Sequence, residues 1–244
     1  MRKQLLYLFI LISVSINAQT SFEKGERFFE AEKWNSAKKE FQQVSASSRQ
    51  FAKSQEYLGD IAAHQKKWDD ALDFYEALVE KYPDNANYNF KYGGALGMKA
   101  LTLSKMQAAF YISDIKHYLK RAAILDSTHI EARWALVELY MKLPGILGGS
   151  AETSYEYANQ LQKISAVDGW LAKGFIAKEE EEFELAETYY KNALKVGGSV
   201  TCYEKLLELY LDRTNEHHKA KDLLEEAQKA HPNTNWSSFV SQFS

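Results

Sequence analysis

Side chains that could bind a metal or move a proton are scattered along this sequence. The histidines lie at positions 64, 117, 129, 217, 218 and 231. Zinc sites need histidine, cysteine or carboxylate ligands at short, regular spacings, and neither H-E-x-x-H nor a Cys/His cluster occurs. His217 and His218 are neighbours, but adjacent helical residues point in different directions. We therefore expect a solvated turn at this pair and no metal site.

Nucleophilic catalysis is equally poorly supported. Cys202 is the only cysteine and has no evident base beside it, and no serine lies in a G-x-S-x-G elbow. Residues 179–182 form an acidic run, which is typical of a solvated surface and could also meet a basic partner. The sequence thus predicts a protein that is not an enzyme and needs no cofactor.

A glycine-rich segment at residues 143–150 reads L-P-G-I-L-G-G-S. Glycine amides at a helix N-terminus can hold an anion, but a phosphate loop also needs a lysine before the serine and a preceding strand. Both are missing, so the segment is interpreted as a shaped connector. Ser150 is then the N-cap of the next helix. Ile146 and Leu147 would pack on the neighbouring hairpin or form part of a contact surface.

The net charge argues against nucleic acid as a partner. The chain carries 30 Lys and Arg against 33 Asp and Glu, a net charge of −3. Removing Arg2 and Lys3 with a leader leaves 28 against 33, a net charge of −5. Binding to a phosphate backbone requires a concentrated positive surface, which no stretch of the chain offers.

The N-terminus has the pattern of an export signal. Arg2 and Lys3 precede a mostly apolar stretch at residues 5–16, and Ala18 offers a cleavage site. The apolar stretch is short for a membrane span of ~20 residues, although an uncleaved anchor helix is the alternative. The sequence predicts a signal peptide over residues 1–18, an exported protein, periplasmic or secreted, and no membrane span after cleavage. With one cysteine, the fold must be held by core packing.

Several residue types repeat at a spacing of 34. Glycine recurs at 25, 59 and 93, tryptophan at 34 and 68, and alanine at 37 and 71. The same interval links the alanine pairs 186 and 220, and 193 and 227. The glycines let two helices approach closely, which must offset a cost of ~1 kcal/mol for glycine inside a helix. An aromatic or large apolar residue follows the alanines at 37, 71, 186 and 220 by four positions, on the same helix face: Phe41, Tyr75, Tyr190 and Leu224.

This pattern resembles the tetratricopeptide repeat family, whose period is 34 residues. The resemblance implies an all-α, right-handed superhelical solenoid of about six helix-turn-helix hairpins. The repeat domain is predicted over residues 19–233. Regular pairs are expected at residues 20–47, 51–82, 167–196 and 201–230. A short capping helix, or a tail that docks into a partner, is expected at residues 234–244.

Two repeats, at about 86–127 and 130–166, depart from the period. The third contains ten added residues between 96 and 113, and without proline or a turn cluster we expect a helix extension of nearly three turns. The fourth has five added residues, which fall in the loop at 143–150.

The resemblance implies partner contacts on the concave face, at set positions of each first helix. These positions hold Phe29, Asp60, His64, Phe90, Met98, Trp134, Glu138, Met141, Phe175, Lys178, Leu209 and Arg213. Aromatic and methionine side chains among charges suit a peptide or a partner's helix. The alternative is that some of these residues fill the inner groove between neighbouring repeats and contact no partner.

Two functions remain open. The first is a scaffold or adaptor of the bacterial cell envelope that binds a protein or peptide. The second is an exported, transporter-associated protein that binds a small ligand beneath residues 97–111 and 143–150. A continuous groove lined by Phe90, Trp134 and Phe175 would favour the peptide, and a closed cavity would favour the small ligand.

Overall fold

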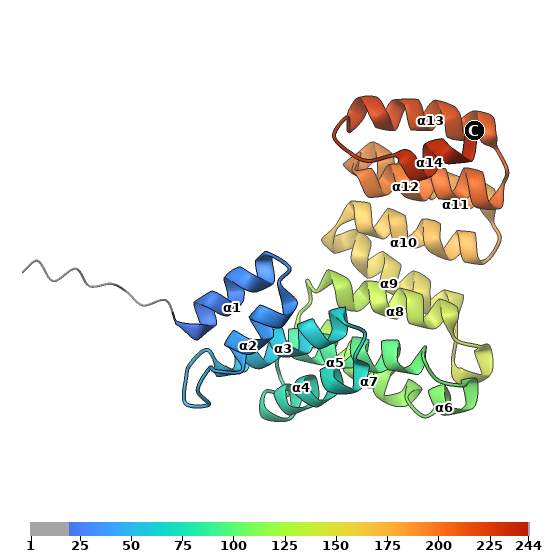
Figure 1. Ribbon diagram of the computed structural model, residues 1–244. Coiled ribbons are helices and arrows are strands. Elements are labelled where there is room, and N and C mark those ends of the chain that lie inside the picture. Colours follow the sequence, from blue (N-terminus) through green and yellow to red (C-terminus); the bar gives the residue numbers. More distant parts are fainter. Residues whose placement is uncertain (1–19, 244) are drawn as a thin grey trace, which may run out of the picture.

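The computed structural model describes residues 20–243, and regular secondary structure within that range is entirely helical. The predicted signal peptide at residues 1–18 lies outside the described residues. Six hairpins follow one another: α1 (Ser21–Glu30) with α2 (Trp34–Phe41), α3 (Phe51–His64) with α4 (Trp68–Lys81), α5 (Ala86–Ala100) with α7 (Ile112–Leu125), α8 (Ile130–Lys142) with α9 (Ala151–Ile164), α10 (Ala166–Glu179) with α11 (Phe183–Gly197), and α12 (Val200–Glu208) with α13 (His217–Ala230). Figure 1 shows these pairs stacked into a solenoid, which confirms the predicted architecture.

Glycines and aromatic rings interlock the helices of a pair. A Cβ atom built on Gly59 would lie 2.4 Å from the ring of Tyr75, and one on Gly174 would lie 2.4 Å from the ring of Tyr190. Gly25 stands in the same relation to Phe41, at 2.6 Å. The ring therefore fills the space that a side chain would need. The alanines at 37, 71, 186 and 220 are all 0% exposed, so the predicted helix crossing is confirmed.

The turns inside four hairpins share a backbone conformation that was not predicted from the sequence. Glu32, Lys66, Glu181 and Asn215 have left-handed φ values between 56° and 61°. These residues are spaced by 34 within each half of the chain. The following residue closes each of the first three turns, as where the Lys67 amide donates to the Ala62 carbonyl at 2.9 Å. A non-glycine residue is sterically strained in this conformation.

The added residues of the third repeat form a separate helix, so the predicted helix extension is wrong. Helix α5 ends at Ala100, and α6 (Lys105–Ala109) starts afresh. Ser104 caps it by accepting from the Gln107 amide, while the Gln107 side chain accepts from the Ser104 amide. This reciprocal capping begins a new helix. Met106 and Phe110 are 78% and 79% exposed, so no apolar neighbour would hold a longer helix in place.

The glycine-rich segment is a connector, as expected. It forms one 3-10 turn, η1 (Gly145–Leu147), and Ser150 then caps α9 by accepting from the Thr153 amide at 3.0 Å. Nζ of Lys116 on α7 donates to the Leu147 carbonyl at 2.8 Å. Ile146 is 94% exposed, so it does not pack on the neighbouring hairpin.

The C-terminus covers the last pair. Trp236, at the start of α14 (Ser237–Val240), is 4% exposed and packs in the core formed by α10–α13. Its indole Nε1 donates to the His231 carbonyl at 3.2 Å. Phe239 and Phe243, the latter in η3 (Ser241–Phe243), pack against the same core. The predicted capping helix is therefore present and folds onto its own chain.

Candidate partner-binding surface

The predicted contact residues lie on the first helix of each pair and differ widely in their surroundings. They are Phe29 on α1, Asp60 and His64 on α3, Phe90 and Met98 on α5, Trp134, Glu138 and Met141 on α8, Phe175 and Lys178 on α10, and Leu209 and Arg213 in the π-helical turn η2 (Leu209–Arg213). The structure divides them into an N-terminal set occupied by internal contacts and a C-terminal groove.

An aromatic cluster joins the first two pairs. The ring of Phe29 lies 5.1 Å from Trp34 and 4.8 Å from Tyr57, centroid to centroid. Trp34 lies 4.2 Å from the imidazole of His64, which is exposed. Phe29 thus packs between two hairpins, and His64 presents one edge of the cluster to solvent.

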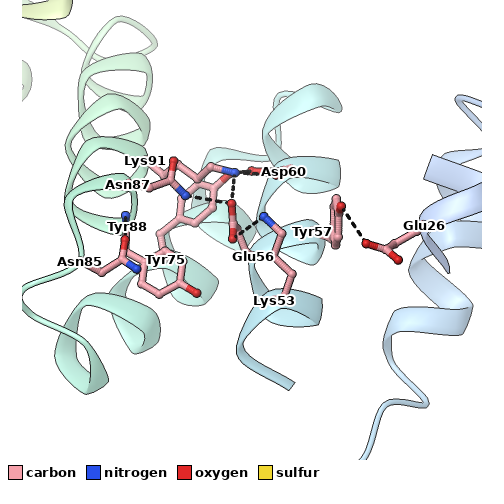
Figure 2. A network of polar contacts seen from close by, with 10 residues as sticks. All are labelled: Glu26, Lys53, Glu56, Tyr57, Asp60, Tyr75, Asn85, Asn87, Tyr88 and Lys91. Atoms are coloured by element: carbon pink, nitrogen blue, oxygen red, sulfur yellow. Dashed lines mark hydrogen bonds and ion pairs between the residues drawn. The ribbon is translucent and has the colours of Figure 1, made fainter. Parts of the chain in front are cut away.

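An ionic network joins the first helices of the second and third pairs (Figure 2). Nζ of Lys91 on α5 lies 2.6 Å from Oδ1 of Asp60 and 2.7 Å from Oε1 of Glu56, both on α3. Tyr75 on α4 donates its hydroxyl hydrogen to Oδ1 of Asp60 at 2.7 Å. Asp60 therefore has two internal partners.

Glu56 is the most buried carboxylate of this network, and its side chain is 5% exposed. Burial raises the pKa of Glu56, but hydrogen bonds from Lys91, Lys53 and Asn87 outweigh burial and lower it overall. The group is therefore a stable carboxylate at neutral pH. Lys53 and Lys91 thus balance the charges of Glu56 and Asp60 within the network.

Two residues of the third pair stand apart from the other predicted contacts. Phe90 lies 4.9 Å from the imidazole of His129 and borders a shallow hollow with Asn87 and Ile130. Met98 is 43% exposed. The continuous groove lined by Phe90, Trp134 and Phe175 that would have favoured a peptide is thus not seen, because Phe90 borders a different hollow from Trp134 and Phe175.

Four predicted residues come together in one groove of about 250 Å³ that crosses α8, α10 and α12. Its lining residues are Trp134, Glu138, Lys142, Leu171, Phe175, Lys178, Tyr190, Thr201 and Lys205. The indole Nε1 of Trp134 donates to Oδ1 of Asp168 at 2.8 Å, which fixes the ring beside the groove. The groove offers two aromatic faces and three ammonium groups to a ligand.

Charges at the rim of the groove are paired along the surface. Lys178 lies 3.4 Å from Glu179, which also lies 3.6 Å from Arg213. Lys205 lies 2.9 Å from Glu208 on the same helix. Such partly exposed pairs contribute little stability and exchange partners readily. The rim can therefore accommodate a charged ligand.

Two predicted residues are placed differently from the expectation. Leu209 is 0% exposed, so it offers no surface to a partner and its prediction is wrong. It starts the π-turn η2, which adds a residue to the helical turn and shifts the register of the side chains that follow. Met141 is half-buried and packs against the core that contains Val137 and Leu161.

Tyr190 and Lys205 line the groove but were not predicted as contact residues. Tyr190 was assigned to helix packing alone, on the second helix, yet it also lines the groove. The sequence did hold a signal for Tyr190. A carboxylate, Asp60, follows Gly59, whereas an aromatic residue, Phe175, follows the equivalent Gly174. Lys205 had no such signal, because the expected contacts of the sixth pair lay further along the helix.

Two features that a metal ion or a membrane would require are missing from the described part of the chain. Residues 20–243 bring no three His, Cys, Asp or Glu side chains together as metal ligands. None of the helices in that range combines the length and the apolar character that a membrane crossing requires.

A sequence model of the tetratricopeptide repeat family matches residues 22–86. A thermophilic repeat protein of Thermus thermophilus superposes with a TM-score of 0.63 at 13% identity, covering 78% of this chain and 97% of the other. The chain folds as a tetratricopeptide repeat (TPR) solenoid. No curated protein matches the sequence.

Two other TPR structures extend the comparison. A TPR protein from Parabacteroides merdae ATCC 43184 gives a TM-score of 0.62 at 14% identity, covering 86% of this chain and 78% of the other. YrrB, described as a TPR protein with an unusual peptide-binding site, gives 0.51 at 13% identity, covering 75% and 87%. At such identities, the likeness concerns the fold alone.

Proposed function

We propose that this protein is a non-catalytic scaffold that binds an extended peptide segment of a partner protein in the groove across α8, α10 and α12. The TPR fold is consistent with a protein-interaction scaffold. The observation that carries the proposal is the grouping of Trp134, Phe175 and Lys178 around one open groove. Aromatic anchors next to long charged side chains are typical of residues that dominate binding energy.

The position of the groove across successive helix pairs suits a peptide. The groove is lined from four helices, α8, α10, α11 and α12, and runs across neighbouring pairs. An extended segment can lie across such a surface and place successive side chains between the helices. YrrB supports the general mode, since it is described as a TPR protein with a peptide-binding site.

The small-ligand alternative required residues 97–111 and 143–150 to close over a cavity. Their large apolar side chains point to solvent instead: Phe110 is 79% exposed and Ile146 is 94% exposed. The connector lies beside α7, where Lys116 donates to its backbone. These features favour a bound peptide over a bound small ligand.

Export to the cell envelope remains part of the proposal and rests on the leader pattern of residues 1–18. N-terminal sequencing of the protein recovered from its native cells tests it, with Gln19 as the expected first residue. A protein that begins at Met1 and stays with the cytosolic fraction would overturn this part alone.

Affinity capture from the native envelope fraction tests the binding role. The bait is the tagged protein, compared with a Trp134→Ala/Phe175→Ala variant. A matched control, Ile124→Ala/Val196→Ala, removes two exposed apolar side chains of the second helices α7 and α11. Melting temperatures of all three baits show that the fold survives, which matters because Trp134→Ala also removes the bond to Asp168.

We expect a protein that is captured by the wild type and the control and is lost from the groove variant. Limited proteolysis of the captured partner then identifies the protected segment. A partner retained equally by the groove variant would place the binding surface elsewhere, and the proposal would fail.

A further inference from the structure

One buried hydroxyl beside the groove has no hydrogen-bond partner among residues 20–243. It belongs to Tyr190, which is 1% exposed and whose ring lies against Gly174. Every other buried side-chain nitrogen or oxygen in that range is paired. Because an unpaired buried hydroxyl destabilises a fold, this one requires an explanation.

Tyr75 occupies the same position in the second pair, and its hydroxyl has a hydrogen-bond partner. Tyr75 follows Ala71 by four residues and covers Gly59, as Tyr190 follows Ala186 and covers Gly174. The Tyr75 hydroxyl donates to Asp60, the residue directly after Gly59. The residue directly after Gly174 is Phe175, so the fifth pair lacks that carboxylate.

A lysine completes the site of the second pair. Nζ of Lys91, from the next pair along the solenoid, lies 2.6 Å from each carboxylate oxygen of Asp60 (Figure 2). The groove over Tyr190 also has ammonium groups, from Lys178 on α10 and Lys205 on α12. Ammonium donors thus recur beside Tyr190. Here Lys178 pairs with Glu179 and Lys205 with Glu208 at the rim, and Glu138 also lines the groove, but none of these carboxylates accepts from the Tyr190 hydroxyl.

Charged side chains of the rim act on the Tyr190 hydroxyl. Burial raises the pKa of Tyr190, and the negative charges of Glu208 and Glu179 raise it further, against a lowering effect of Arg213. These side chains come from α12, α10 and η2, which border the groove. The hydroxyl keeps its proton at neutral pH and is available as a donor.

We propose that this groove holds a carboxylate of the bound peptide, which accepts a hydrogen bond from Tyr190 Oη and pairs with Lys178 or Lys205. The inference rests on the proposed function and deepens it, since it assigns an acidic residue to the partner segment. Trp134, Leu171 and Phe175 contact an apolar side chain next to that residue. The peptide carboxylate takes the place that Asp60 takes in the second pair.

The test uses random peptides displayed on phage and selected on the immobilised protein. Enriched peptides are synthesised in three forms: the parent, one with the acidic residue changed to its amide (Asp→Asn or Glu→Gln), and one with a C-terminal carboxamide. Fluorescence anisotropy measures the Kd of each. The second form tests a side-chain carboxylate as the bound group, and the third tests the chain-terminal carboxylate.

We expect enrichment of acidic peptides, and a rise in Kd of about tenfold or more when the bound carboxylate becomes an amide, because hydrogen bonds to charged groups are strong. With Tyr190→Phe the same change should matter much less, since the two deletions share one contact. Lys178→Met and Lys205→Met show which ammonium pairs with the carboxylate. Tyr75→Phe is the matched control and should leave every Kd unchanged.

The two proposals fail in different ways. Peptides that need Trp134 and Phe175 but bind equally well as acid and amide, and equally to Tyr190→Phe, would overturn the carboxylate site while the binding groove stands. Selected peptides that bind the Trp134→Ala/Phe175→Ala variant as tightly as the wild type would overturn the groove itself. Circular dichroism confirms the helical content of each variant.

Discussion

The hydroxyl of Tyr75 donates to Oδ1 of Asp60 at 2.7 Å, from the second helix of a pair to the first. Removing that hydroxyl with Tyr75→Phe should lower the free energy of unfolding by about 1 kcal/mol. The same change at Tyr190 removes an unpaired hydroxyl and should raise it by up to about 1 kcal/mol. Urea denaturation of the two variants measures both signs. Equal destabilisation by both changes would mean that Tyr190 is satisfied in solution.

The left-handed turn residues predict a stabilising substitution. Glu181 has a φ of 61°, where a residue with a Cβ is strained and glycine is not. Glu181→Gly should stabilise the protein by about 0.5–1 kcal/mol after the larger chain entropy of glycine is subtracted. Asn215→Gly, at a φ of 56°, should gain less, because asparagine tolerates this conformation. Differential scanning calorimetry compares the two, and a lower melting temperature for Glu181→Gly would contradict the argument.

The helix crossings predict intolerance of larger side chains. Ala71 and Ala186 are 0% exposed where the second helix crosses the first. Replacing either with leucine should overpack the pair and cost about 1–3 kcal/mol. Thr188→Leu places the same side chain on an exposed position of α11 and is the control. If Ala186→Leu melts at the same temperature as Thr188→Leu, the close crossing assigned to this pair is wrong.

Glu187 ties the fifth pair to the sixth and predicts a pH dependence. It accepts from the Tyr210 hydroxyl at 2.8 Å and lies 2.7 Å from Lys191 and 3.2 Å from Lys219. Burial raises its pKa, but hydrogen bonds from Lys191, Tyr210 and Lys219 lower it from 4.5 to about 2. A lowered pKa stabilises the folded state above the ordinary value, and that stability is lost as the pH falls from 4.5 towards 2.

Glu187→Gln should therefore cost about 1–3 kcal/mol at neutral pH and progressively less below pH 4.5. Unfolding in urea across that pH range gives the difference between variant and wild type. Glu184→Gln, an exposed carboxylate on the same helix, is the control and should show no such trend. A constant difference at all pH values would exclude Glu187 as the titrating group.

The sequence predicted the packing within pairs because that packing depends on residues close together in the chain. Gly59 and Tyr75 lie on the two helices of one hairpin, which a short turn connects. Helix geometry then brings the two positions face to face across the pair. The same reasoning located Ser150 as an N-cap, since a capping side chain acts on an amide three residues away. It did not find the left-handed residues such as Lys66, because Lys and Glu carry no turn signal.

The third repeat shows where local pattern was insufficient. An apolar, proline-free stretch indicated one long helix, but the capping pair of Ser104 and Gln107 divides it. One long helix and two capped helices both fit the local sequence. The second is formed because Met106 and Phe110 are exposed and have no apolar surface to hold a longer helix. Leu209 was predicted as a contact residue from its position in the repeat. The π-turn adds a residue to the helical turn, so that position no longer corresponds to an exposed side chain.

The sequence by itself determined the fold class and the repeat period, because glycine, alanine and aromatic residues at fixed spacing specify how each pair of helices closes. Tertiary structure alone decided which first-helix residues share a surface. Whether Trp134 and Phe175 meet, and whether Tyr190 finds a carboxylate, depends on how successive pairs stack. Stacking sums many weak contacts between residues far apart in the chain, and no local spacing encodes that sum.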